Sequence, residues 1–194
     1  MSEPKSRRSR EKAWVSSLVP RLQSVLGEDE TLDVCDGFRL PYRNEIHSYK
    51  GEGIEIGRPN VKGYQTDLLI SEIIRGGWIP RVVIECKIGG VTTHDALTYS
   101  AKAATHKHVH PYLRYGILIG ALGCVPSRLI HHGTQFDFMA AWPEETATAE
   151  EWQAFVAVLK DEVQASRLLG ELMQNRSHKL IHRPLRLPLA HSHP

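Results

Sequence analysis

Two carboxylates and an amine stand at the ends of two apolar segments of this chain. Asp67 lies within the segment GYQTDLLI, and seventeen residues separate it from the triplet Glu85-Cys86-Lys87, which follows the run RVVI. Both segments are rich in β-branched and aliphatic residues and have Gly or Pro nearby, which predicts strands. Side chains of a strand alternate between its faces, so Glu85 and Lys87 share a face and Cys86 points away. If the two strands pair, Asp67 meets Glu85 and Lys87 at one end of a sheet.

Two carboxylates and an ammonium group in one place suit metal-dependent hydrolysis of a phosphodiester. Carboxylate oxygens are the ligands that Mg2+ prefers, and we expect Mn2+ to substitute for it. Such an ion polarises the phosphate and lowers the pKa of a bound water, while the lysine orients or helps to deprotonate that water. Alternatively, Glu85 and Lys87 form a weak surface pair on an edge strand. The apolar run Val82–Ile84 favours a central strand instead, where charged residues are costly unless they have a purpose.

This pattern resembles the PD-(D/E)XK nuclease superfamily, in which an acid on one strand precedes Glu or Asp, any residue, and Lys on the next. Asp67 matches the first acid, Glu85 the second and Lys87 the lysine, whereas Thr66 stands where the family name has proline. The resemblance covers roughly residues 45 to 120. It implies an α/β fold with a mixed central β-sheet flanked by helices, the restriction-endonuclease-like fold. It also implies that Asp67, Glu85 and the backbone carbonyl of Cys86 bind the metal.

The superfamily often has a third carboxylate upstream of the first acid, and a polar residue on the helix after the lysine. We favour Glu45 for the third carboxylate, because Ile46 and Tyr49 beside it suggest partial burial, with Glu52 as the next choice. Glu11 and Glu55 are further candidates. On the following helix, the residues expected to face the site are Thr98, Tyr99 and Lys102.

The size and composition of the chain indicate an ordinary globular protein. Its 194 residues, 41% hydrophobic and 24% charged, predict one domain with a sizeable core. No apolar run has membrane-spanning length, and the polar, basic N-terminus is unlike a signal peptide. Three widely spaced cysteines indicate reduced thiols and a cytoplasmic protein. We expect a disordered basic N-terminus over residues 1–10, a single nuclease domain over 11–176 and an irregular basic tail over 177–194.

The net charge of +2 does not itself demand a nucleic-acid partner, so DNA contacts must come from local clusters. Basic residues gather at both termini and after the candidate site. Of these we assign Lys102, Lys107 and Arg114 to DNA binding, where each cation would strengthen binding by releasing counterions. The histidines lack the spacing of strong zinc motifs.

Periodicity places these residues on a helix from about 11 to 26, strands over 64–71 and 81–88, and a helix from Thr92 or Thr93 to about 107. Further strands are expected over 54–56, 112–122 and 136–140, and a long helix from 148 to about 175. Residues 31–40 read as either a strand or a loop. This order predicts a mixed sheet covered by helices.

The function that the motif implies is a Mg2+-dependent DNA endonuclease, most simply a sequence-specific type II restriction enzyme. Cutting both strands of double-stranded DNA with one site per subunit would require a homodimer. The alternatives are a repair or recombination nuclease such as a junction resolvase, and a non-catalytic DNA-binding subunit with the same fold.

Overall fold

The computed structural model describes residues 6–46, 48–50, 55–56 and 60–175. Helices and strands follow one another along the chain in the order α1 (Arg7–Leu26), β1 (Leu32–Asp36), β2 (Arg39–Glu45), β3 (Tyr49–Lys50), β4 (Glu55–Ile56), β5 (Asn60–Gln65), β6 (Leu68–Ile74), β7 (Gly77–Ile88), α2 (Thr93–Val109), β8 (Arg114–Gly120), α3 (Ser127–His132), β9 (Phe138–Ala141) and α4 (Ala149–Gln174).

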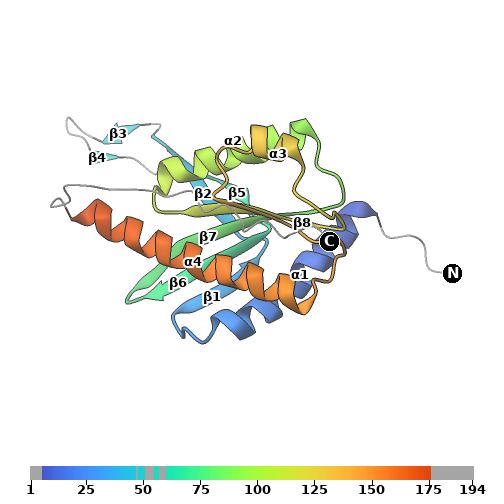
Figure 1. Cartoon of the computed structure of the whole chain (residues 1–194). Helices are drawn as coiled ribbons and strands as arrows, with labels where there is room; N and C mark the ends of the chain where they lie inside the picture. Colours follow the sequence, from blue (N-terminus) through green and yellow to red (C-terminus); the bar gives the residue numbers. More distant parts are fainter. Residues whose placement is uncertain (1–5, 47, 51–54, 57–59, 176–194) are drawn as a thin grey trace.

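Five strands form the central sheet in the spatial order β1-β6-β7-β8-β9. The pairs β1–β6 and β6–β7 are antiparallel, whereas β7–β8 and β8–β9 are parallel. Helices α2 and α3 connect the parallel strands across one face, and α1 and α4 cover the other face (Figure 1). The predicted α/β class, with a mixed sheet flanked by helices, is confirmed.

The central strand β7 is buried on both faces, as its apolar sequence predicts. Val82, Ile84 and Cys86 point into the core that packs beneath α1 and α4, while Val83 points into the core beneath α2. The alternation therefore directs Glu85 and Lys87 to the α2 face and Cys86 to the other face. Burial raises the pKa of the Cys86 thiol well above its usual range, so this thiol is protonated and unreactive.

We expect Cys86→Ala to retain metal-dependent activity and to lower the free energy of unfolding by roughly 1 to 2 kcal/mol, the scale of a small cavity in a packed core. The side chain is only 1% exposed and faces away from Glu85, so its loss should be felt in packing alone. Urea denaturation beside a cleavage assay measures both effects. A folded Cys86→Ala protein without activity would contradict this strand register.

Capping boxes mark the first residues of two of the helices that flank the sheet, α2 and α4. Thr92 and Thr148 are the N-caps of α2 and α4, and Asp95 and Glu151 reach back to the cap backbone. Both starts agree with the sequence-based prediction. Within the described part of the chain, no helix is long and apolar enough to cross a membrane.

Two predicted boundaries need correction, and one helix is an addition. Residues 7–10 are helical rather than disordered, because Ser6 caps α1 by accepting a hydrogen bond from the Ser9 amide at 3.3 Å. The single strand predicted over 64–71 is two strands, β5 and β6, separated by a bend at Thr66-Asp67. The short helix α3 was not predicted. The tail predicted over 177–194 lies outside the described residues.

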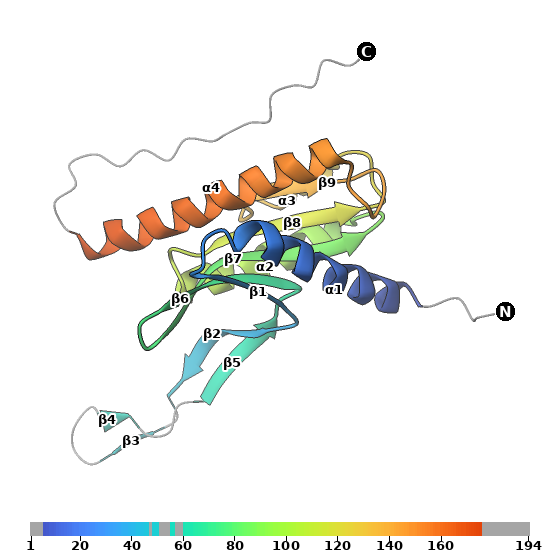
Figure 2. The same ribbon diagram turned by 90° about the horizontal axis from the view of Figure 1, so that it is seen from below.

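A two-stranded ribbon of β2 and β5 extends away from the central sheet, with the short pair β3–β4 at its outer end (Figure 2). The ribbon is antiparallel, and Arg39 pairs with Gln65 at its base while Glu45 pairs with Asn60 farther out. Because β5 is followed by the bend that holds Asp67, the ribbon is joined directly to the candidate site.

Candidate active site

Asp67 is held at the bend between β5 and β6 by backbone contacts. The buried Thr66 donates from its amide and its hydroxyl to the Phe38 carbonyl, at 2.8 and 3.0 Å. The Asp67 carboxylate accepts from the Cys86 amide through Oδ2 at 2.8 Å. Strand β6 pairs with β7 only from Leu68, opposite Ile84, so the Asp67 side chain continues the hydrogen bonding to β7 just before β6 begins.

Glu85 lies opposite this bend and is almost completely buried, with 2% of its side chain exposed. Its Oε1 accepts from the Tyr115 hydroxyl at 2.5 Å and lies 2.7 Å from the Lys102 ammonium. Tyr115 comes from β8 and Lys102 from α2, so three elements fix the orientation of this carboxylate. A buried carboxylate needs such partners, and here they occupy only one of its two oxygens.

The two carboxylates are close enough for each to affect the ionisation of the other. Burial and the charge of Glu85 together raise the pKa of Asp67 to about 6, against the opposing effects of the Cys86 amide and Lys102. Like charges held together in this way favour uptake of a cation, either a proton or a metal ion. The observed donors, two carboxylates beside a strand backbone, fit Mg2+ or Mn2+, since both prefer oxygen ligands.

Lys87 shares the face of Glu85 but turns its ammonium toward the start of α2. Its Nζ lies 3.4 Å from Asp95 Oδ1 and 3.4 Å from the Tyr99 hydroxyl. Burial by itself would lower the pKa of Lys87, but Tyr99 and Asp95 outweigh it and the pKa is raised. Lys87 is therefore a cation in this arrangement. The amine that contacts Glu85 is Lys102, which the sequence predicts both to face the site from this helix and to bind DNA.

Of the two candidates for a third carboxylate whose side chains are described, Glu11 lies nearer to the site than Glu45. Its Oε2 accepts from the Ile88 amide at 3.1 Å, and its charge raises the pKa of Lys87. Glu45, the favoured candidate, lies at the outer end of β2, paired with Arg43 and within 3.2 Å of Asn60 Nδ2. Six residues of strand, about 20 Å, separate it from the ribbon base at Arg39. Glu52 and Glu55 are outside the residues whose side chains are described.

The other two residues assigned to DNA binding have acidic partners. Lys107 lies 2.8 Å from Asp137, and Arg114 lies 3.0 Å from the same carboxylate and also pairs with Glu162. None of these contacts links Lys107 or Arg114 to Asp67 or Glu85.

Two residues that position the site were not predicted from the sequence. The sequence indicates Tyr115 only as part of a buried strand, and Asp95 only as an acidic residue early in a helix. Register provides the signal that could have found Tyr115: β7 and β8 are parallel with Val83 opposite Tyr115, so Tyr115 shares the face of Glu85. Asp95 fits the capping pattern after Thr92 and also holds Lys87, through its second oxygen.

Behind Tyr115 lies a buried histidine without a hydrogen-bond partner among the described residues. The His106 side chain is 0% exposed and neither ring nitrogen is satisfied, while the nearby Pro41 carbonyl lies 3.1 Å from His110 Nε2. The ring stacks on Tyr115, with centroids 5.8 Å apart, and meets the edge of Tyr64. Burial and the charge of Lys102 lower the pKa of His106 to about 4. The ring is therefore neutral and packs as an aromatic group.

This lowered pKa predicts a pH-dependent stability. The folded value of about 4 lies below the unfolded value of 6.5, so the unfolded chain takes up the proton first and stability falls as pH drops from about 6.5 toward 4. We expect His106→Phe to lose less stability than the wild type between pH 7 and 5, by about 2 kcal/mol. Urea denaturation at the two pH values measures the difference. Equal pH dependence in both proteins would contradict the burial of a neutral ring.

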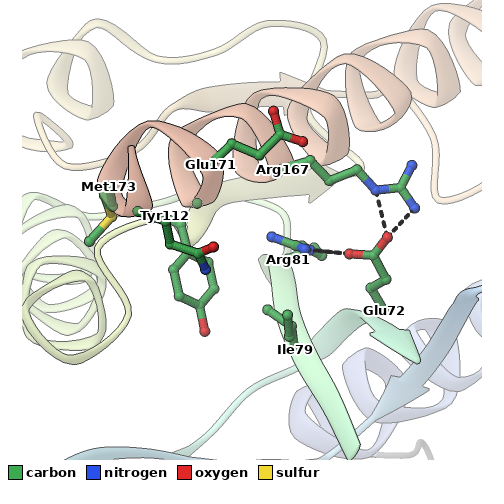
Figure 3. A pocket seen from close by; sticks show the side chains of 9 residues that line it. Glu72, Ile79, Arg81, Tyr112, Arg167, Glu171 and Met173 are labelled. Carbon is green, nitrogen blue, oxygen red and sulfur yellow. Dashed lines mark hydrogen bonds and ion pairs between the residues drawn. The ribbon is translucent and has the colours of Figure 1, made fainter. Parts of the chain in front are cut away.

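A pocket of about 500 Å3 lies at the opposite end of β7, between that strand and the last turns of α4 (Figure 3). Its polar wall is a cluster in which Glu72 accepts from Arg81 and Arg167, each at 2.7 Å from the guanidinium Nε. Arg167 also lies 2.8 Å from Asp29. These charges satisfy one another, which indicates a structural contact between α4 and the sheet rather than a second reactive centre.

Within the described residues, no group of three or more His, Cys, Asp or Glu side chains is arranged to hold a metal ion. The candidate metal ligands are therefore the two carboxylates Asp67 and Glu85, supplemented by backbone oxygen. No known protein family matches the chain, and no curated protein matches it either.

Proposed function

We propose that this protein is a Mg2+-dependent DNA endonuclease with a restriction-endonuclease-like fold. The observation that carries the proposal is the convergence of Asp67, from the bend before β6, and Glu85, from β7, at a buried end of the sheet. Two carboxylates in a water-poor site are costly unless a cation accompanies them. The lysines beside them are better suited to an anionic substrate than to a neutral one.

Each residue has a distinct role in this proposal. Asp67 and Glu85 would hold the metal, with the Cys86 backbone carbonyl as a further ligand. Bound there, Mg2+ would polarise the scissile phosphate and lower the pKa of the attacking water. Lys87, fixed as a cation by Asp95 and Tyr99, offsets the negative charge that develops on the phosphate. Tyr115 and Lys102 hold Glu85 in its orientation.

The proposed substrate is double-stranded DNA, and the proposed biological role is restriction. Each chain supplies one Asp67–Glu85 pair, so cleavage of both strands would be the work of a homodimer. A junction resolvase with the same chemistry is the second candidate, because its DNA would meet the same residues. A non-catalytic DNA-binding subunit is disfavoured, since such a subunit does not need an acidic pair or a positioned lysine.

Incubation of the purified protein with plasmid DNA tests the proposal directly. Mg2+ should give cleavage and excess EDTA should prevent it. Discrete fragments would favour restriction, and cutting of four-way junctions alone would favour a resolvase. Intact plasmid and junction DNA in both Mg2+ and Mn2+ would overturn the nuclease proposal.

A further inference from the structure

The β2–β5 ribbon is attached to the candidate site at its base. Strand β5 ends at Gln65, two residues before Asp67. The Lys102 ammonium donates to the Gln65 carbonyl at 2.7 Å and contacts Glu85 at the same distance. One side chain thus joins the ribbon to the buried carboxylate, and the base of the ribbon lies beside the site.

A bulge gives the ribbon base a defined shape. Pro41 pairs with Gly63 and Arg43 pairs with Lys62, so Tyr42 is an extra residue on β2. Its ring stacks on Tyr64, with centroids 4.1 Å apart and planes 11° apart. Bulges beside active sites bend a strand and redirect its side chains. Both rings also contact His106 of α2, with centroids 6.3 and 5.8 Å away, so the ribbon base packs against that helix.

Gly63 is required for this close packing of the two strands. A Cβ at Gly63 would come within 2.8 Å of Arg39 Cγ and 2.9 Å of the Leu40 carbonyl oxygen, which no side chain tolerates without movement. The ribbon base is therefore a built feature rather than a loose loop.

The ribbon carries two cations without an ion-pair partner among the described residues, whereas several cations on the body of the molecule are paired. Arg39 is exposed and Lys62 half-buried, and neither has an ion-pair partner among the described residues, whereas Arg43 pairs with Glu45. On the body, Lys107, Arg114 and Arg167 all face carboxylates. Unpaired cations on a projecting element are available to an external polyanion.

The shape of the ribbon also suits a duplex. The six residues of β5 span about 20 Å, and the major groove of B-DNA, about 12 Å wide, admits a two-stranded ribbon. We infer that the β2–β5 ribbon is a DNA-contacting arm that lies along the duplex beside the scissile phosphate, with Arg39 and Lys62 at backbone phosphates. The inference rests on the proposed nuclease function and names the element that binds its substrate.

The test measures DNA binding separately from cleavage. The double variant Arg39→Gln/Lys62→Gln is compared with the wild type on a 30-base-pair duplex in Ca2+, at several salt concentrations. We expect affinity to fall at least about tenfold at low salt. The slope of log affinity against log salt should shrink by about 2, because each lost phosphate contact removes about 0.9. The matched control is Arg75→Gln/Arg128→Gln, which removes the same charge from exposed residues that have no ion pair in the described structure.

The outcomes separate the arm from the nuclease activity. If the wild type binds and cuts DNA, and the two double variants have the same DNA affinity as each other, the proposal of a DNA-contacting arm is overturned and the nuclease proposal stands. A wild type that neither binds nor cuts DNA overturns both. Sedimentation of the same proteins covers the remaining case: loss of a dimer with unchanged DNA affinity would make the ribbon a subunit contact instead.

Discussion

Glu85→Gln should reduce Mg2+-dependent DNA cleavage at least about a thousandfold, a loss of about 4 kcal/mol of transition-state stabilisation. The amide keeps an oxygen that can accept from the Tyr115 hydroxyl, so the side chain stays in place, but it removes the negative charge that the metal requires. Asp67→Asn should have a similar effect, because it removes the other carboxylate of the pair.

Single-turnover cleavage of a plasmid, beside circular dichroism of the variants, measures this loss and checks the fold. The matched control is Glu162→Gln, which changes a partly buried Glu that pairs with Arg114 away from the site. The control should cut at close to the wild-type rate. If Glu85→Gln were folded and as active as this control, the acidic pair would not be the catalytic centre.

Metal binding gives a readout that does not depend on turnover. Mg2+ or Ca2+ should raise the melting temperature of the wild type by mass action, because the ion binds the folded chain. Asp67→Asn should lose most of that increase. A full increase in this variant would mean that the ions bind elsewhere on the protein.

The alternation of strand residues explains why much of the site could be predicted from sequence. A period of two puts Glu85 and Lys87 on one face and Cys86 on the other, whatever the rest of the fold. The apolar runs around the motif made a central strand the best interpretation, and the structure confirms it for β7. The helix starts followed from Thr92 and Thr148, because caps depend on nearby residues.

The contacts that could not be predicted from the sequence join residues that lie far apart in the chain. Tyr115 reaches Glu85 from β8, and no local pattern in the sequence predicts that contact. Lys102 was expected to face the site from α2, but its contact with Glu85 depends on how α2 packs on the sheet. Glu11 reaches β7 from α1, and its contact with the Ile88 amide joins residues 77 apart in the chain. The ribbon explains why Glu45 does not lie beside Asp67. Its neighbours suggest partial burial, but β2 leaves the sheet and carries Glu45 to the outer end of the ribbon.

Lys87→Ala should slow the chemical step at least about a hundredfold, close to 3 kcal/mol, while DNA affinity in Ca2+ stays within a few-fold of the wild type. Asp95 and Tyr99 hold the Lys87 ammonium on the same face as Glu85, and the raised pKa keeps it charged. A fixed positive charge near the reacting phosphate stabilises the transition state more than the bound substrate. Phosphate contacts elsewhere along the duplex carry most of the affinity.

Three further variants separate the effect of the Lys87 charge from the effect of its exact position. Lys87→Arg keeps the charge and should recover part of the lost rate if electrostatic stabilisation dominates, whereas Lys87→Gln should resemble Lys87→Ala. Asp95→Asn should have a smaller effect than either, because Tyr99 still holds the ammonium after the ion pair is lost. A Lys87→Ala protein that binds DNA poorly yet cuts normally at saturation would make Lys87 a phosphate anchor. Asp67 and Glu85 would then carry the chemistry without it.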